Sequence, residues 1–126
     1  MAASKPRVPT GGELQILRVL WARGASTVRQ IVEQMSGTGY TTALKLLQIM
    51  HKKGLVSRDE TGHAHIYQST FSQDELERLM ARDLADRAFG GSASRLALQA
   101  LSAKGASEEE LAEIRKLLSR LEDDDT

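Results

Sequence analysis

The chain has 126 residues, no cysteine, and 17 basic against 17 acidic residues. This length allows one modest core, or a small domain with an appendage. Without cysteine there is neither a disulfide framework nor a thiolate metal site. No apolar run approaches the roughly 20 residues of a membrane span, and the polar start lacks a signal-peptide core. These features indicate a soluble, cytoplasmic protein without membrane contact.

The charge is distributed unevenly along the chain. Residues 1–70 carry nine Lys or Arg and four Asp or Glu, a net charge of +5, whereas residues 71–126 carry a net charge of −5. A basic half joined to an acidic half is typical of one module that faces nucleic acid and another that faces protein or solvent.

The N-terminal part is predicted to form a flexible arm followed by a helix. Residues 1–9 contain both prolines and form the arm. Thr10 and Glu13 fit a capping box, which opens a helix that runs to about Arg23. Trp21 is interpreted as a core anchor rather than a base-stacking platform, because its neighbours are apolar. The apolar surface of this helix is predicted to comprise Leu14, Leu17, Val19, Leu20 and Trp21.

A second short helix follows the break at Gly24. Ser26 can cap this helix, which is expected to end before Gly37. In a helix-turn-helix it would cross the DNA backbone, with Thr27 and Arg29 near its start able to meet phosphate. The apolar residues at helical spacing are Val28, Ile31, Val32 and Met35.

The segment from Tyr40 to Gly54 predicts a third, well-delimited helix. Thr41 is the expected N-cap and Gly54 the expected stop. One face carries Ala43, Leu46, Leu47 and Met50, and the opposite face carries Thr41, Lys45, Gln48 and Lys52. No carboxylate occurs from residue 34 to residue 58, so the outward face can meet phosphates and base edges. The alternative is an ordinary solvated amphipathic helix.

Two β-prone runs come directly after this helix. Residues 55–58 and 64–69 are joined by residues 59–63, in which Gly62 is expected to supply a turn conformation that a side chain would resist. Two short helices, a third helix and a hairpin are the order of a winged helix-turn-helix. Residues 41–53 would then form the recognition helix.

From residue 72 onward the sequence predicts helices alone. Capping boxes begin at Ser72 and Ser107, and Ser92 or Ser94 starts a helix between them. Three leucine-rich helices in this length cannot bury their own apolar stripes well, so pairing with a second copy is expected. The residues predicted to form the dimer are Leu79, Leu84, Phe89, Leu96, Leu111, Ile114, Leu117, Leu118 and Leu121.

The predicted fold is therefore mainly α. A winged helix-turn-helix domain covers residues 10–71, and a helical dimerisation domain with an acidic tail covers residues 72–126. The predicted DNA-binding residues are Thr27, Arg29, Tyr40, Thr41, Thr42, Lys45, Gln48, Lys52, Arg58 and His63.

Over residues 10–121 the chain resembles the penicillinase-repressor family, which includes methicillin-resistance and copper-responsive repressors. The resemblance is carried by residues 14–21 and 25–29, by YTTALKLLQIMHKKGLV from Tyr40, by GHAHIY from Gly62, and by FGGS from Phe89. It implies a homodimer that binds a promoter inverted repeat with TACA and TGTA half-sites and blocks transcription. No cofactor is expected.

The chain departs from the family pattern at several positions. In antibiotic-responsive relatives, a membrane sensor and a regulatory protease are implied, with a cut between Asn and Phe where this chain has Gln99 and Ala100. Many relatives have Arg where this chain has Ile49 and His63. Copper-responsive relatives use a C-terminal cysteine cluster, which this chain lacks.

Two other classes of function are alternatives. His63 and His65 share one strand face, and Asp59, Glu60 and His51 are candidate partners in a metal site, but wing histidines are more often surface groups than metal ligands. No Gly-rich phosphate loop, nucleophile elbow or strong acid–base pair indicates an enzyme. The remaining alternative is a winged helix that binds protein without binding DNA.

Overall fold

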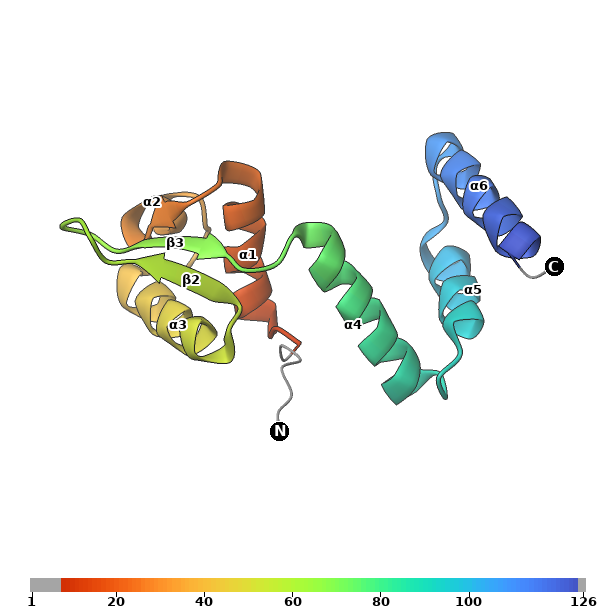
Figure 1. The fold of residues 1–126 in the computed structure, drawn as a ribbon, viewed down its shortest axis with the longest axis horizontal. Helices are drawn as coiled ribbons and strands as arrows, with labels where there is room; N and C mark the ends of the chain where they lie inside the picture. The colour runs from red at the N-terminus through yellow and green to blue at the C-terminus, as the bar shows by residue number, and fades with distance from the viewer. Residues whose placement is uncertain (1–7, 125–126) are drawn as a thin grey trace. The chain divides into compact units, whose positions relative to one another are not determined.

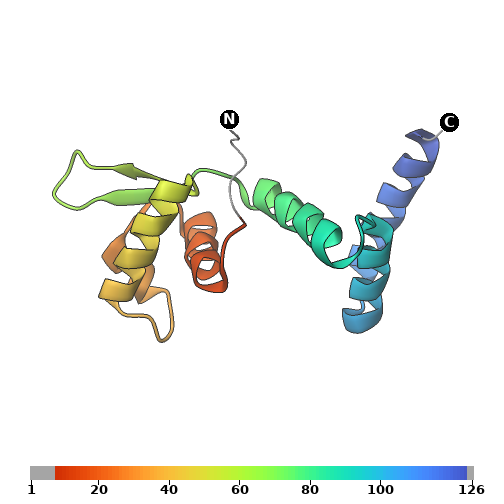
Figure 2. The ribbon, with the colours of Figure 1, turned by 90° about the horizontal axis from the view of Figure 1, so that it is seen from below.

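The computed structural model describes residues 8–124, so most of the predicted arm and the end of the acidic tail lie outside the described residues. The chain divides into two compact units, one up to Asp83 and one from Leu84 onward. The elements, drawn in Figures 1 and 2, are α1 (Gly11–Arg23), β1 (Ser26–Thr27), α2 (Val28–Glu33), α3 (Tyr40–Lys53), β2 (Val56–Asp59), β3 (Ile66–Ser69), α4 (Gln73–Ala88), α5 (Ala93–Lys104) and α6 (Glu108–Asp124). Within residues 8–124, no helix is long and apolar enough to cross a membrane.

The core of the first unit lies between the three helices and the sheet. Its fully buried side chains include Ile16, Ile31 and Leu47, one from each helix, together with Tyr67 from β3. The sequence prediction missed Ile16. The predicted apolar face of α3 is confirmed, because its members Ala43, Leu47 and Met50 are buried and Leu46 is packed against the core.

Trp21 closes one side of this core. Its indole Nε1 donates hydrogen bonds to Ser69 Oγ at 3.1 Å and to the Phe71 carbonyl at 3.0 Å. The ring packs against the buried cluster, so the prediction that Trp21 anchors the core is confirmed. The contacts join the end of α1 to the chain that leaves β3.

The sheet has a third strand that the sequence analysis did not predict. Its order is β1-β3-β2, with antiparallel pairing of Ser26 to Tyr67 and of Arg58 to Tyr67. The prediction that Ser26 caps α2 is wrong, because pairing with β3 turns Ser26 inward, where it is 1% exposed. Thr27 caps α2 instead, in a capping box with Gln30.

The ends of α3 differ in how well they were predicted. Gly54 stops the helix in a left-handed conformation with φ of 82°, as expected. Thr41 is not the N-cap, because the helix begins one residue earlier at Tyr40 and Gly39 is the capping residue. Gly39 has no side chain, so no side-chain hydrogen bond caps the start of α3.

The wing turn is held by a side chain rather than by glycine. The expectation for Gly62 is wrong, since it is not among the glycines with positive φ. The Asp59 carboxylate instead accepts hydrogen bonds from the Thr61 backbone N–H at 3.0 Å and the Thr61 hydroxyl at 2.7 Å. These bonds hold the pKa of the Asp59 carboxyl below its ordinary value.

The first half of α4 belongs to the first unit. Leu76 is buried in the core, and Leu79 and Met80 pack against it. The compact units therefore divide within α4, later than the predicted boundary after residue 71. Leu79, one of the residues predicted to form the dimer, is already packed within its own chain.

A buried ion pair joins the start of α1 to the end of α3. Lys53 Nζ lies 2.9 Å and 2.8 Å from the two carboxylate oxygens of Glu13, which is 2% exposed. Glu13 also completes the predicted capping box with Thr10. Burial alone would raise the pKa of the Glu13 carboxyl, but the hydrogen bonds from Lys53 and Thr10 outweigh it and lower that pKa below 4.5.

Replacing Lys53 with methionine is expected to destabilise the fold. The change leaves the Glu13 carboxylate buried without its ammonium partner, and breaking a buried pair costs several kcal/mol. Because Lys53 is itself partly exposed, we expect a loss of about 2 kcal/mol in the free energy of unfolding at pH 7. Urea denaturation followed by circular dichroism measures this loss.

The double variant Glu13→Gln with Lys53→Met is the matched control, since it buries no charge and should recover part of the loss. The stability that Glu13 contributes is present above pH 4.5 and is lost as the pH falls through its lowered folded-state pKa. The stability difference between wild type and Glu13→Gln should therefore shrink in acid. A Lys53→Met protein as stable as wild type at pH 7 would contradict this assignment.

Candidate nucleic-acid interface

The outer face of α3 is a polar, carboxylate-free surface. The predicted residues on this helix are all exposed: Tyr40, Thr41, Thr42, Lys45, Gln48 and Lys52. Ile49, which is 39% exposed, adds an apolar group to the same helix. Hydroxyl, amide and ammonium groups can bond to base edges and phosphates, and an apolar group can contact a thymine methyl.

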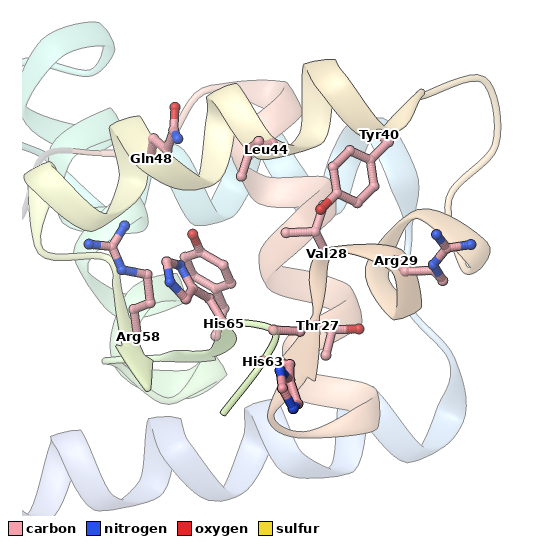
Figure 3. A pocket seen from close by; sticks show the side chains of 11 residues that line it. Thr27, Val28, Arg29, Tyr40, Leu44, Gln48, Arg58, His63 and His65 are labelled. Carbon is pink, nitrogen blue, oxygen red and sulfur yellow. The ribbon is translucent and has the colours of Figure 1, made fainter. Parts of the chain in front are cut away.

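A groove of about 630 Å³ lies beside α3, between the start of α2 and the wing (Figure 3). Its lining residues come from segments that are distant in the sequence: β1 and α2, α3, and the wing with its strands β2 and β3. Six predicted DNA-binding residues line it: Thr27, Arg29, Tyr40, Gln48, Arg58 and His63. The other four predicted residues lie on α3 outside the groove lining.

The sequence analysis missed several groove residues. Leu44, Ala64, His65 and Tyr67 also line it. The sequence analysis placed His65 and Tyr67 in the wing motif and named His65 as a possible metal ligand, but it assigned neither to the DNA-binding residues. The alternation along β3, where Ile66 is exposed and Tyr67 buried, is the signal that could have placed Tyr67 on the inner face.

Thr27 both caps α2 and lines the groove. Its hydroxyl oxygen accepts a hydrogen bond from the Gln30 backbone N–H at 3.2 Å, and its own N–H donates to Gln30 Oε1 at 2.9 Å. The hydroxyl can still donate its hydrogen to an acceptor in the groove. Arg29, a cation two residues further along the chain, is exposed in the first turn of α2.

Arg58 is the cation that the wing contributes. It lies opposite Tyr67 in the β2–β3 pair, and its Nε donates to Glu60 Oε2 at 2.6 Å. The Tyr67 hydroxyl is buried and makes no direct hydrogen bond among the described residues.

The histidines of the wing do not form part of a larger cluster of metal-binding groups. Across residues 8–124, no three His, Cys, Asp or Glu side chains are arranged to hold a metal ion. His63 and His65 are both exposed. They line the groove together with the two arginines and the amide of Gln48.

Known proteins resemble this chain over most of its length. The penicillinase repressor family model matches residues 9–120. The transcriptional regulator BlaI of Mycobacterium tuberculosis is 33% identical over 115 residues, which are 87% of this chain and 82% of that protein. The methicillin resistance regulatory protein MecI of Staphylococcus aureus is 18% identical over 114 residues, which are 88% of this chain and 93% of that protein.

A solved structure shares the fold. The crystal structure of Mycobacterium tuberculosis Rv0081 aligns with a TM-score of 0.51 and 20% identity, covering 77% of this chain and 84% of that one. The element order and the family match together establish a winged-helix fold. Proteins of this family are transcriptional repressors and not enzymes. This chain belongs to the penicillinase repressor family.

Proposed function

We propose that this chain represses transcription by binding a promoter operator as a homodimer, in the cytoplasm. The observation that carries the proposal is the carboxylate-free outer face of α3, flanked by a groove with Arg29 and Arg58. Its membership of a repressor family supports the same function. The net charge of +5 in residues 1–70 favours a polyanionic partner for the winged-helix part of the chain.

In the proposed complex, α3 enters the major groove of the DNA. Thr41, Thr42, Lys45 and Gln48 are exposed along one side of it and would meet base edges. Residues at the groove edge, with Arg29 on α2 and Arg58 on β2, would meet the phosphates. Gln48 lines the groove as well as the outer face, so it lies where both kinds of contact converge.

The proposed dimer rests on the apolar surface of the C-terminal helices. Neither α5 nor α6 has a buried residue within this chain. Several large apolar side chains of these two helices are strongly exposed: Leu98 at 65%, Leu117 at 46%, Leu118 at 53% and Leu121 at 55%. Leu84, near the end of α4, is 41% exposed. Monomeric proteins rarely leave such a stripe in water, and a second copy would cover it with an identical stripe.

The first experiment is a fluorescence-anisotropy titration of the protein with DNA from upstream of its own gene. A scrambled duplex of equal length is the control, and both are measured at two salt concentrations. We expect tighter binding to the promoter and a steep loss of affinity with salt, because phosphate contacts release counterions. Equal binding to both duplexes, or none, would reject the operator proposal and favour a protein-binding winged helix.

Lys45→Ala separates base reading from phosphate binding. If Lys45 meets phosphate, the variant should bind both duplexes more weakly, and the slope of log K against log salt should fall by about 1. If Lys45 reads a base, the preference for the operator should fall by about 1–3 kcal/mol. Lys116→Ala on α6 is the matched control and should change neither quantity. A Lys45→Ala protein with unchanged affinity, slope and preference would remove Lys45 from the interface.

Leu118→Asp tests the dimer. A carboxylate in the middle of the α6 stripe should yield monomers in sedimentation velocity and lower operator affinity about 100-fold, because each half-site is then bound alone. Ala112→Asp introduces the same group on the polar side of α6 and should leave a dimer. A wild-type protein that sediments as a monomer at micromolar concentration would refute the dimer.

A further inference from the structure

Within the wing, the guanidinium of Arg58, which lines the groove, is paired with the carboxylate of Glu60. Arg58 Nε and Glu60 Oε2 are 2.6 Å apart, and Glu60 follows Arg58 by two residues as β2 ends. The Arg58 side chain is 23% exposed, whereas that of Glu60 is 53% exposed. The arginine is therefore the fixed partner, and the glutamate is the one that can swing into solvent.

We propose that Glu60 occupies the place of a DNA phosphate on Arg58 in the free protein and is displaced when DNA binds. Glu60 would then be an intramolecular competitor that sets how strongly the wing holds the DNA backbone. The inference rests on the proposed function, since it names the ligand of Arg58 within that interface as a phosphate group.

The geometry of Arg58 suits this exchange. A guanidinium binds carboxylate and phosphate oxygens through the same N–H donors. Cross-strand pairing with Tyr67 keeps the arginine at the groove, where Arg29 and His63 also lie. A phosphate that reaches the groove therefore meets a positioned guanidinium whose Nε already has an anionic partner.

The neighbouring carboxylate is not available for this role. Asp59 accepts both hydrogen bonds of Thr61 and shapes the wing turn. It stands opposite Ile66 in the sheet, and Ile66 is exposed on the outer face. Of the two acidic residues in the wing, only Glu60 is therefore assigned as the competitor. Asp59 holds the turn in place while Glu60 moves.

The competition would act on any DNA sequence. Phosphates carry no sequence information, so Glu60 would weaken binding to operator and non-operator DNA by the same factor. Base contacts from α3 would then have to supply the remaining affinity. An exposed ion pair is worth little, so removing the competitor should tighten binding by about two- to fivefold at low salt.

The test is a double-mutant cycle measured by anisotropy on operator and scrambled duplexes at low salt. Glu60→Gln should tighten binding to both duplexes by about two- to fivefold. In an Arg58→Gln background, the gain should drop to that of Glu33→Gln, which removes one exposed carboxylate from α2 and serves as the charge-matched control. Thermal melts of all variants check that the fold is retained.

An equal gain from Glu60→Gln with and without Arg58 would overturn the inference and leave only a general charge effect. A gain no larger than that of Glu33→Gln would also overturn it. Failure of the proposed function is distinguishable, because the wild-type protein would then show no preference for the operator in the same titrations.

A nuclear magnetic resonance measurement gives a readout independent of affinity. The Arg58 Nε–H signal of the free protein should be protected from exchange with water by its bond to Glu60. Glu60→Ala, which has no side-chain acceptor, should lose this protection, and added DNA should restore it in the variant. No change in protection between wild type and Glu60→Ala would overturn the proposed pairing.

Discussion

The ion pair of Glu13 and Lys53 is the constraint on which the interface depends. It ties the first turn of α1 to the last turn of α3, while the apolar face of α3 packs on the core. An apolar face alone tolerates small rotations of a helix, whereas a two-oxygen contact to a buried carboxylate restricts them. The pair therefore helps to determine which side chains of α3 point outward.

Local signals in the sequence were enough to place most helices. The capping boxes at Thr10, Ser72 and Ser107 and the stop at Gly54 each depend on residues a few positions apart. Longer-range features were not legible. Glu13 and Lys53 are 40 residues apart in the sequence, and β1 and β3 are separated by a similar length of chain. Nothing in the local sequence distinguishes Lys53 from its neighbour Lys52. The same reason explains Ser26, whose local sequence suits a cap but whose strand pairing turns it inward.

In the candidate site, too, some features could be predicted from the local sequence and others could not. The exposed face of α3 follows from helical periodicity, so its polar members could be identified from the sequence alone. The groove could not, because its outline depends on the register that puts Arg58 opposite Tyr67 and on the wing turn that Asp59 holds. Individual groove residues were predicted, but the hydroxyl of Tyr67 and the contact of Arg58 with Glu60 required the assembled sheet.

The separation of charge between residues 1–70 and residues 71–126 has a consequence for how the DNA is bound. A net charge of −5 in residues 71–126 repels the DNA backbone, so the C-terminal helices are unsuited to bind DNA non-specifically. Contacts with DNA are then left to the winged helix, where Glu60 offsets one of the cations. In the proposed dimer, affinity would come chiefly from linking two modest interfaces, because linked binding multiplies the contributions of two half-sites while each interface alone stays weak. The exposed leucines of α5 and α6 would provide the surface for that linkage in the proposed dimer.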